Sequence, residues 1–172
     1  MKKTLNISIF IIVLLLIVIV FMIVYPQPNS INKQFKGIRY SAVNNVFTDL
    51  SINDIDNYTN IEVNINGDFK NEVNGIDFNK YFEGEITIYE ENSESIIYIN
   101  KAYHEENNVY KGQIFIKNKD EISSGFIYIY SEKNNIEKIF LFYHKTSTKY
   151  NLISIPAQNI EGALQTREFL YR

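Results

Sequence analysis

The residues of this chain best suited to metal or acid–base chemistry are its two histidines and the acids beside them. His104 precedes Glu105 and Glu106 at the end of one expected strand, and His144 ends another. A zinc or transition-metal site needs three or four converging ligands, usually with paired spacing such as His-x-His or Glu-x-x-His. The sequence contains neither pattern, so each histidine is interpreted as a solvated turn residue and no metal ligand is predicted.

Other carboxylates cluster in turns. Asp54 and Asp56 have the spacing of a calcium-loop start, but Tyr58 takes the next ligand position and no glycine follows. Further acids would form an acidic rim if two turns lay side by side: Glu90, Glu91, Glu94, Glu105 and Glu106. Paired carboxylates can hydrolyse glycosides, whereas exposed acids also keep a domain soluble. The second interpretation is the simpler one.

The sequence offers few candidate nucleophiles for catalysis. The chain has no cysteine, which excludes thiol nucleophiles, disulfides and sortase-like transpeptidation. Ser30 and Lys33 form a Ser-x-x-Lys string, but it follows two prolines in a polar segment instead of lying on a helix that holds the lysine beside a buried serine. We therefore predict no catalytic residue and no cofactor, and we expect the chain not to be an enzyme.

Aromatic residues provide the best candidate for binding. One face of the expected middle strands carries isoleucines, and the opposite face is aromatic where a solvated sheet would be polar. The simpler cover for this face is the expected C-terminal helix or a helix at residues 40–50. The alternative is an open surface for a protein, an apolar ligand or a glycan. The candidate binding face lies on two neighbouring strands: Phe126, Tyr128, Tyr130, Phe140 and Phe142.

An apolar segment precedes these strands. Residues 7–25 carry no charge and would span about 28 Å as a helix, close to the thickness of a bilayer core. No small-x-small cleavage site follows, so an uncleaved transmembrane helix is favoured over a signal peptide. Lys2 and Lys3 favour a cytoplasmic tail at residues 1–6, which places the C-terminal domain outside the cell membrane in a single-pass topology. Residues 26–36 are expected to be a tether.

Residues 37–172 are expected to form one extracytoplasmic domain of the α+β class. A short amphipathic helix is predicted from Tyr40 to Leu50, with an edge strand at residues 35–40 as the alternative, and Ser51–Asp54 resembles a capping box. An antiparallel meander of about seven strands follows, near residues 61–66, 82–89, 96–99, 110–117, 126–130, 139–143 and 152–155. Pro156 ends the last strand, and Asn159 can cap a C-terminal helix that packs on the sheet.

Glycines recur near the start of three strands, at Gly84, Gly112 and Gly125. We interpret them as sites of a bulge or of close backbone approach.

Four segments of the chain resemble those of a group of small uncharacterised Firmicutes proteins: Ile61–Gly67, Tyr81–Ile88, Gly125–Ile129 and Ile155–Leu164. That group pairs an N-terminal anchor with a β-rich domain and ends in a helix begun by Pro-Ala. The resemblance implies a fold and a low-GC Gram-positive source but no activity, and Gly162 departs from the pattern.

Charge narrows the classes of function. Only Lys2 and Lys3 precede the apolar segment, so the remainder carries 15 Lys and Arg against 20 Asp and Glu. An acidic domain lacks the basic surface that nucleic-acid binding requires.

The leading hypothesis for function is a membrane-tethered, non-enzymatic interaction or binding module at a bacterial cell surface. The alternatives are a lipocalin-like carrier of an apolar ligand, in which the strands close into a barrel, and a carboxylate-dependent hydrolase.

Overall fold

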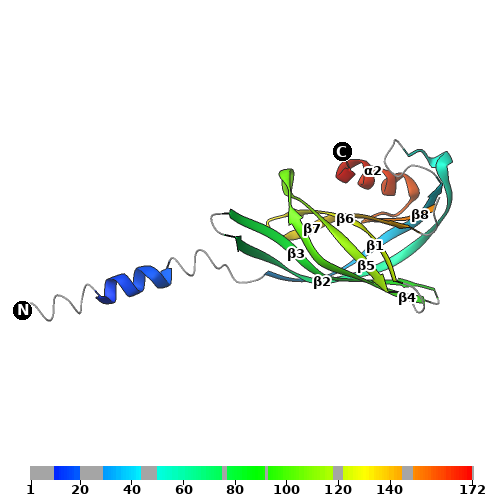
Figure 1. Cartoon of the computed structure of the whole chain (residues 1–172). Helices are drawn as coiled ribbons and strands as arrows, with labels where there is room; N and C mark the ends of the chain where they lie inside the picture. The colour runs from blue at the N-terminus through cyan, green and yellow to red at the C-terminus, as the bar shows by residue number, and fades with distance from the viewer. Residues whose placement is uncertain are drawn as a thin grey trace, which may run out of the picture.

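The computed structural model describes residues 10–19, 29–43, 50–74, 77–91, 93–117, 122–144 and 149–171. Residues 10–19 form a helix, and the remainder is an antiparallel barrel with one C-terminal helix (Figure 1). No helix within the described residues combines the length and the apolarity that crossing a bilayer requires. The other residues of the predicted span 7–25 lie outside the described ranges.

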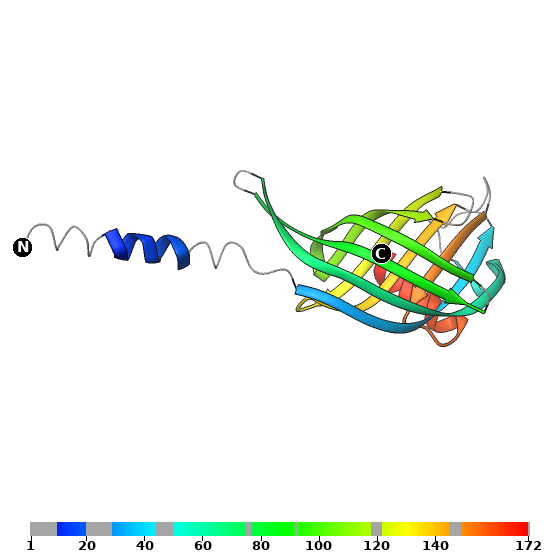
Figure 2. The ribbon, with the colours of Figure 1, turned by 90° about the horizontal axis from the view of Figure 1, so that it is seen from below.

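Eight strands follow one another around the barrel, which closes where the first strand pairs with the eighth (Figure 2). They are β1 (Asn29–Val43), β2 (Ile55–Asn74), β3 (Asp77–Glu90), β4 (Ser93–His104), β5 (Val109–Lys117), β6 (Ile122–Glu132), β7 (Asn135–His144) and β8 (Lys149–Ile155). Two 3-10 turns, η1 (Ile52–Asp54) and η2 (Glu106–Asn108), and the helix α2 (Ile160–Tyr171) complete the described domain. The predicted antiparallel meander with a C-terminal helix is confirmed.

The N-terminal part of the domain corrects the sequence analysis. β1 occupies most of the predicted tether and also the first residues of the predicted helix, from Tyr40 to Val43. The sheet therefore has eight strands instead of about seven. The helical spacing of apolar residues there does not produce a helix, because strand pairing determines the conformation. β1 pairs with β2 from Asn29 to Ala42 and with β8 from Ile38 to Val43. Residues 44–49 of the predicted helix lie outside the described ranges. The capping box is confirmed, since the Ser51 backbone N–H donates to Asp54 Oδ2 at 2.8 Å.

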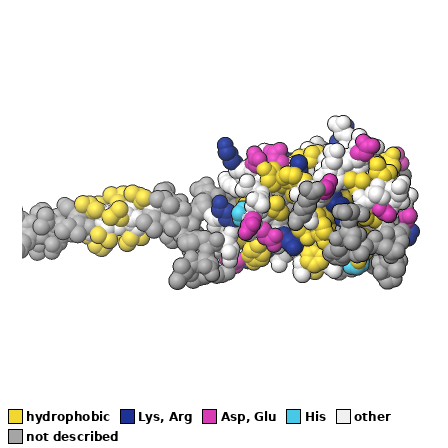
Figure 3. Space-filling view, turned by 90° about the horizontal axis from the view of Figure 1, so that it is seen from above, with side chains coloured by type: hydrophobic (Ala, Val, Ile, Leu, Met, Phe, Trp, Pro, Cys, Tyr) yellow, Lys and Arg dark blue, Asp and Glu magenta, His cyan; other side chains and the backbone are white. Residues whose placement is uncertain are grey.

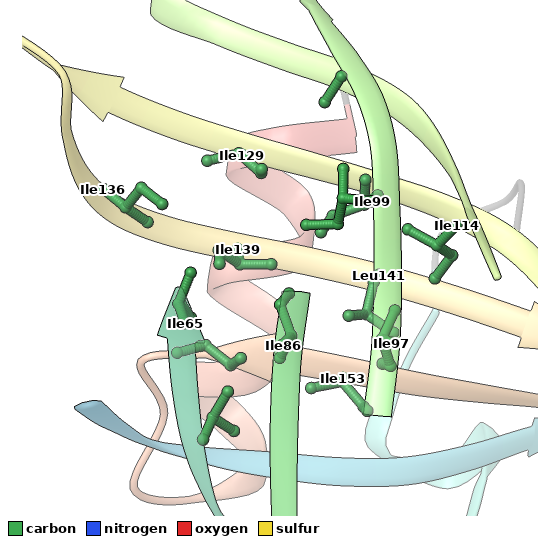
Figure 4. Packing of buried hydrophobic residues seen from close by; sticks show 14 of the residues in the cluster. Ile65, Ile86, Ile97, Ile99, Ile114, Ile129, Ile136, Ile139, Leu141 and Ile153 are labelled. Atoms are coloured by element: carbon green, nitrogen blue, oxygen red, sulfur yellow. The ribbon is translucent and has the colours of Figure 1, made fainter. Parts of the chain in front are cut away.

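The barrel interior is filled mainly by branched aliphatic side chains. Alternate residues of every strand point inward and form one buried cluster (Figure 4). Eight strands enclose a space that side chains can just fill. Each fully buried isoleucine stabilises the fold by about 1.5–3 kcal/mol relative to an exposed one. Ten members of this cluster are labelled in Figure 4: Ile65, Ile86, Ile97, Ile99, Ile114, Ile129, Ile136, Ile139, Leu141 and Ile153.

Gly84 illustrates how the barrel wall bends. It lies beside Gly67 of β2, and a Cβ atom on Gly84 would come within 2.3 Å of the Asn66 carbonyl oxygen. The pairing of β3 with β4 shifts between Phe82 and Gly84, as in a β-bulge. The interpretation of Gly84 as a bulge and close-approach residue is therefore confirmed.

The helix α2 packs outside the barrel against β7, β8, β6 and β1 (Figure 1). Beneath it lies a second buried cluster, separate from the interior: Ile38, Tyr40, Ala42, Tyr128, Phe140, Phe142, Leu152, Ala157, Ala163 and Leu170. The Asn159 side chain accepts a hydrogen bond of 2.8 Å from the Gly162 backbone N–H, which confirms the predicted cap and shows how Gly162 takes part in the helix start.

The meander gives the barrel two ends with different connections. The start of β1 and the β2–β3, β4–β5 and β6–β7 connections share one end, called here the proximal end, because successive strands run in opposite directions. The β1–β2, β3–β4, β5–β6 and β7–β8 connections share the distal end. Near the distal end an ion pair of 2.7 Å joins Arg39 of β1 to the mostly buried Glu90 of β3. The proximal end contains η2 and the point where the predicted anchor would meet the barrel.

Candidate binding surface

The five residues of the candidate binding face lie on the outer wall of β6 and β7, where they form cross-strand pairs. Phe126 is opposite Phe142, with ring centroids 5.7 Å apart, and Tyr128 is opposite Phe140, with centroids 6.2 Å apart. Tyr130 lies nearer the β6–β7 turn on the same face. Cross-strand aromatic pairs stabilise a sheet by about 0.2–1 kcal/mol each. The structure thus brings all five residues together on one wall.

The C-terminal helix covers most of this wall. The Tyr171 ring lies 5.2 Å from that of Tyr128 and 6.0 Å from those of Phe140 and Phe142. Phe169 contacts Tyr130 edge-on at 5.1 Å. Phe140 is completely buried as a result. These contacts make Tyr128, Phe140 and Phe142 part of the packing beneath α2.

The aromatic wall continues beyond α2 and is open there. Phe126, Phe115 and Tyr98 have exposed fractions of 39%, 45% and 43%. They lie on three successive strands, with Tyr98 of β4 directly opposite Phe115 of β5. Figure 3 shows hydrophobic side chains between charged ones on one side of the barrel. Such a contiguous set of exposed rings is a feature of ligand-binding and partner-binding surfaces.

Two neighbouring hollows that share lining residues lie on this side, and together we call them the wall groove. The first, about 1320 Å³, lies between the barrel wall and the C-terminal end of α2 and is lined by His104, Glu105, Glu106, Asn107, Val109, Lys111, Tyr128, Phe169, Leu170 and Tyr171. The second, about 500 Å³, runs along the outer wall and is lined by Asn100, Lys101, Tyr103, Glu105, Lys111, Gly112, Gln113, Phe115 and Phe126. Glu105 and Lys111 line both hollows.

Positive and negative groups meet at the centre of the wall groove. The Lys111 ammonium lies 5.3 Å from the Tyr128 ring centroid, a cation–π contact. Burial, followed by the Glu105 carboxylate, raises the pKa of the Tyr128 phenol. Burial also raises the pKa of Tyr171. A phenol is protonated at neutral pH even without this shift, so each hydroxyl has one O–H donor and acceptor lone pairs.

The two histidines are far apart in the barrel. His104 is exposed at the proximal end, where its ring packs edge-on against Tyr110 with the ring centroids 5.1 Å apart. His144 is exposed at the distal end, with its ring 4.4 Å from that of Tyr150. Within the described ranges, no three His, Cys, Asp or Glu residues converge as a metal site would require. The structure assigns His104 instead to the lining of the wall groove.

The structure does not form the acidic rim that was the less favoured interpretation of these acids. Glu90, Glu91 and Glu94 belong to the β3–β4 connection at the distal end, whereas Glu105 and Glu106 belong to the β4–β5 connection at the proximal end. Consecutive connections of an antiparallel meander alternate between the two ends, so these turns cannot lie side by side.

The other candidate groups have local structural contacts. Asp54 caps η1 through Ser51, and the Asp56 carboxylate accepts a hydrogen bond of 2.8 Å from Lys149 Nζ. Ser30 Oγ donates to Asp68 Oδ1 at 2.6 Å, while Lys33 Nζ donates to the Ile136 carbonyl at 3.0 Å. Ser30 and Lys33 therefore form no catalytic pair with each other.

Sequence reasoning did not identify Lys111, Glu105 and Tyr171 as neighbours of the aromatic wall. Tyr171 lay in the expected helical stripe, but its contacts depend on where α2 docks. Lys111 had a detectable signal, because it shares the outward parity of Gln113 and Phe115 on β5. Glu105 had no signal of this kind, since it lies in a connection.

Comparison of this chain with protein-family models, with curated proteins and with solved structures finds no match in any of the three.

Proposed function

We propose that this protein is a non-enzymatic binding module that holds its ligand on the outer wall of the barrel, beside α2. The observation that carries this proposal is the contrast between the two sides of the wall. The interior is filled by buried aliphatic side chains, whereas Tyr98, Phe115 and Phe126 stay exposed beside a groove with polar groups. Binding sites combine exposed apolar area with a few well-placed polar groups, and the wall groove has both.

We further propose that residues 7–25 anchor this module in a cell membrane, with the N-terminus inside and the barrel outside. The uncharged apolar run supports this, as does the helical conformation of residues 10–19 in its centre. The segments that resemble those of the Firmicutes group support a Gram-positive source. The anchor would keep the barrel at the surface where its ligand occurs.

A lipocalin-like carrier is the second candidate, because the sheet does close into an eight-stranded barrel. An interior ligand would need space that the aliphatic core occupies in this structure. A carboxylate-dependent hydrolase receives less support, because the acids that could have formed a rim are divided between the two ends of the barrel.

Photo-crosslinking from defined positions tests the proposal. A benzophenone amino acid replaces Phe126 in the full-length protein in cells, and in a matched variant it replaces Tyr58, which is exposed on β2 away from the groove. We expect a discrete adduct from position 126 and none from position 58. Equal labelling at both positions would contradict a wall-groove ligand. Saturable uptake of a fluorescent fatty acid that is lost in an Ile86→Trp variant would favour the carrier instead.

The anchor is tested separately by washing membranes with alkaline carbonate and by treating wall-stripped cells with protease. We expect the protein to resist extraction and its barrel to be digested. Release by carbonate would exclude the anchor, and protection from protease would reverse the orientation.

A further inference from the structure

We propose that the ligand of the wall groove is the glycan headgroup of a membrane lipid. This rests on the proposed function, and it adds the chemical class of the ligand and its source. The inference combines three features of the groove: the chemistry of its lining, the hydrogen bonding of the strands beneath it, and its position relative to the predicted anchor.

The lining alternates aromatic rings with polar groups. Tyr103, Phe115 and Phe126 line the outer part of the groove together with Asn100 and Gln113. Sugars have an apolar face of C–H groups that stacks on aromatic rings, and hydroxyl groups at their edges that bond to amides, carboxylates and ammonium groups. Lys and Glu both occur in the lining, so a headgroup without strong net charge fits best.

Two other ligand classes fit less well. An extended peptide usually binds by adding a strand to a free sheet edge. The groove lies over β4, β5 and β6, each of which pairs with a strand on both sides, so no free edge is offered there. An acyl chain needs an apolar lining along its whole length, and Lys101, Glu105 and Gln113 interrupt this one.

The position of the groove indicates the source of the glycan. Its α2 part includes η2, at the proximal end where β1 begins. Only residues 26–28 separate the predicted anchor from Asn29, and four peptide steps from Tyr25 reach at most about 14 Å. The proximal end is therefore held close to the bilayer, and this places η2 at the end of the barrel that a headgroup rising from the surface can reach. Phe115 and Phe126 lie further along the wall for the following sugars.

A tryptophan reporter tests this in the full-length protein. The chain contains no tryptophan, so Phe126→Trp provides a single emission signal inside the groove. The protein is reconstituted into phosphatidylcholine vesicles with or without synthetic diacylglycerols that carry neutral dihexose or di-N-acetylhexosamine headgroups. We expect a saturable change in emission only with a glycolipid. Adding Phe115→Ala should abolish the change, and adding Tyr58→Ala should leave it intact.

Each other outcome overturns a defined part of the inference. No change with either glycolipid, in protein that resists carbonate, would overturn the glycan while leaving the anchored module standing. An equal change in vesicles without sugar would identify lipid contact instead of glycan binding. Saturation by free disaccharide at the same concentration as by glycolipid would overturn the membrane source. Protein that carbonate releases would instead refute the anchor of the proposed function.

Discussion

The inner and outer faces of β6 and β7 are built from the same two strands, yet they are covered in different ways. The inner face carries Ile127, Ile129, Ile139 and Leu141, and the other strands of the barrel bury all four. The outer face carries the five aromatic residues of the candidate binding face, and α2 covers only part of it.

The difference shows where this fold can evolve a ligand site. Closing the barrel buries the inner face against itself, and branched aliphatic side chains fill the limited space. The outer face has no such closure, so its coverage depends on how far one helix reaches. Beyond the end of α2 the rings stay exposed, and the wall groove is formed there.

Removal of α2, which covers part of the outer face, should cause the largest loss of stability. A chain that ends at Gln158 would expose the buried cluster beneath the helix, including Phe140, Phe142 and Leu152. Each such side chain contributes about 1.5–3 kcal/mol, so the loss approaches the whole stability of a typical domain. We expect non-cooperative urea unfolding and binding of an apolar dye, measured in the same detergent as the full-length protein. A cooperative truncated protein that binds no dye would show that the outer cluster needs no cover.

Neighbouring substitutions on β6 compare the two faces directly. Ile127→Ala removes a fully buried side chain and should lower the free energy of unfolding by about 2–5 kcal/mol. Phe126→Ala removes an exposed ring that contacts only the edge of the covered region and should cost less than about 1 kcal/mol. Urea denaturation of both variants measures the difference. Equal losses would mean that the open rings are structural and not reserved for a ligand.

Alkaline pH should weaken the packing beneath α2 by an intermediate amount. Burial raises the pKa of Tyr40 from 10.0 to about 12, although its hydroxyl lies 3.2 Å from Ser154 Oγ. The unfolded chain therefore loses this proton first, and the stabilisation present below pH 10 is lost as the pH rises to about 12. The loss amounts to roughly 2–3 kcal/mol at most.

Tyr40→Phe isolates this effect from other tyrosines. The difference in unfolding free energy between the native protein and this variant should shrink across the same alkaline range, as followed by urea denaturation at several pH values. A difference that does not vary with pH would show that Tyr40 is solvated in the folded protein.

Breaking either of two ion pairs should cause the smallest losses of stability. Arg39 and Glu90 point into the distal end, with Glu90 mostly buried, whereas the side chains of Lys149 and Asp56 are much more exposed. Arg39→Met leaves a carboxylate without its charge partner and should destabilise the barrel by about 1–3 kcal/mol. Lys149→Met should cost about 0–1 kcal/mol. Thermal unfolding at neutral pH ranks the two, and a larger loss for Lys149→Met would contradict the assignment of Glu90 to the inner side.

Much of the β-structure could be predicted because its side chains alternate clearly. The seven segments from Ile61 to Ile155 all lie within observed strands, and Asn159 caps the helix as expected. β1 was expected only as an alternative edge strand at residues 35–40. Tyr40 and its neighbours also have spacings of three and four residues, while Lys33 and Arg39 occupy inward positions near the ends of the barrel. Polar residues at inward positions interrupt the alternation of apolar and polar residues that identifies a strand. Only the pairing with β2 and β8 establishes that this segment is a strand.

The candidate site was predictable in part for a related reason. The aromatic parity of Phe126, Tyr128 and Tyr130 is a property of one strand and can be read directly from the chain. The separation of the acidic turns follows from the alternation of ends in a meander, so the same strand assignment could have excluded the rim. How much of the wall Tyr171 covers depends on the docking of α2, which no local pattern records.

The sequence by itself determined the apolar N-terminal segment, the alternating strands and the two-faced chemistry of β6 and β7, because these depend on residue type and local period. Only the tertiary structure decided that β1 meets β8, since closure depends on register summed around eight strands. It also decided that α2 stops short of Phe126 and that Lys111 and Glu105 line the open groove. These outcomes depend on contacts between residues far apart in the chain, and such contacts have no period in the sequence.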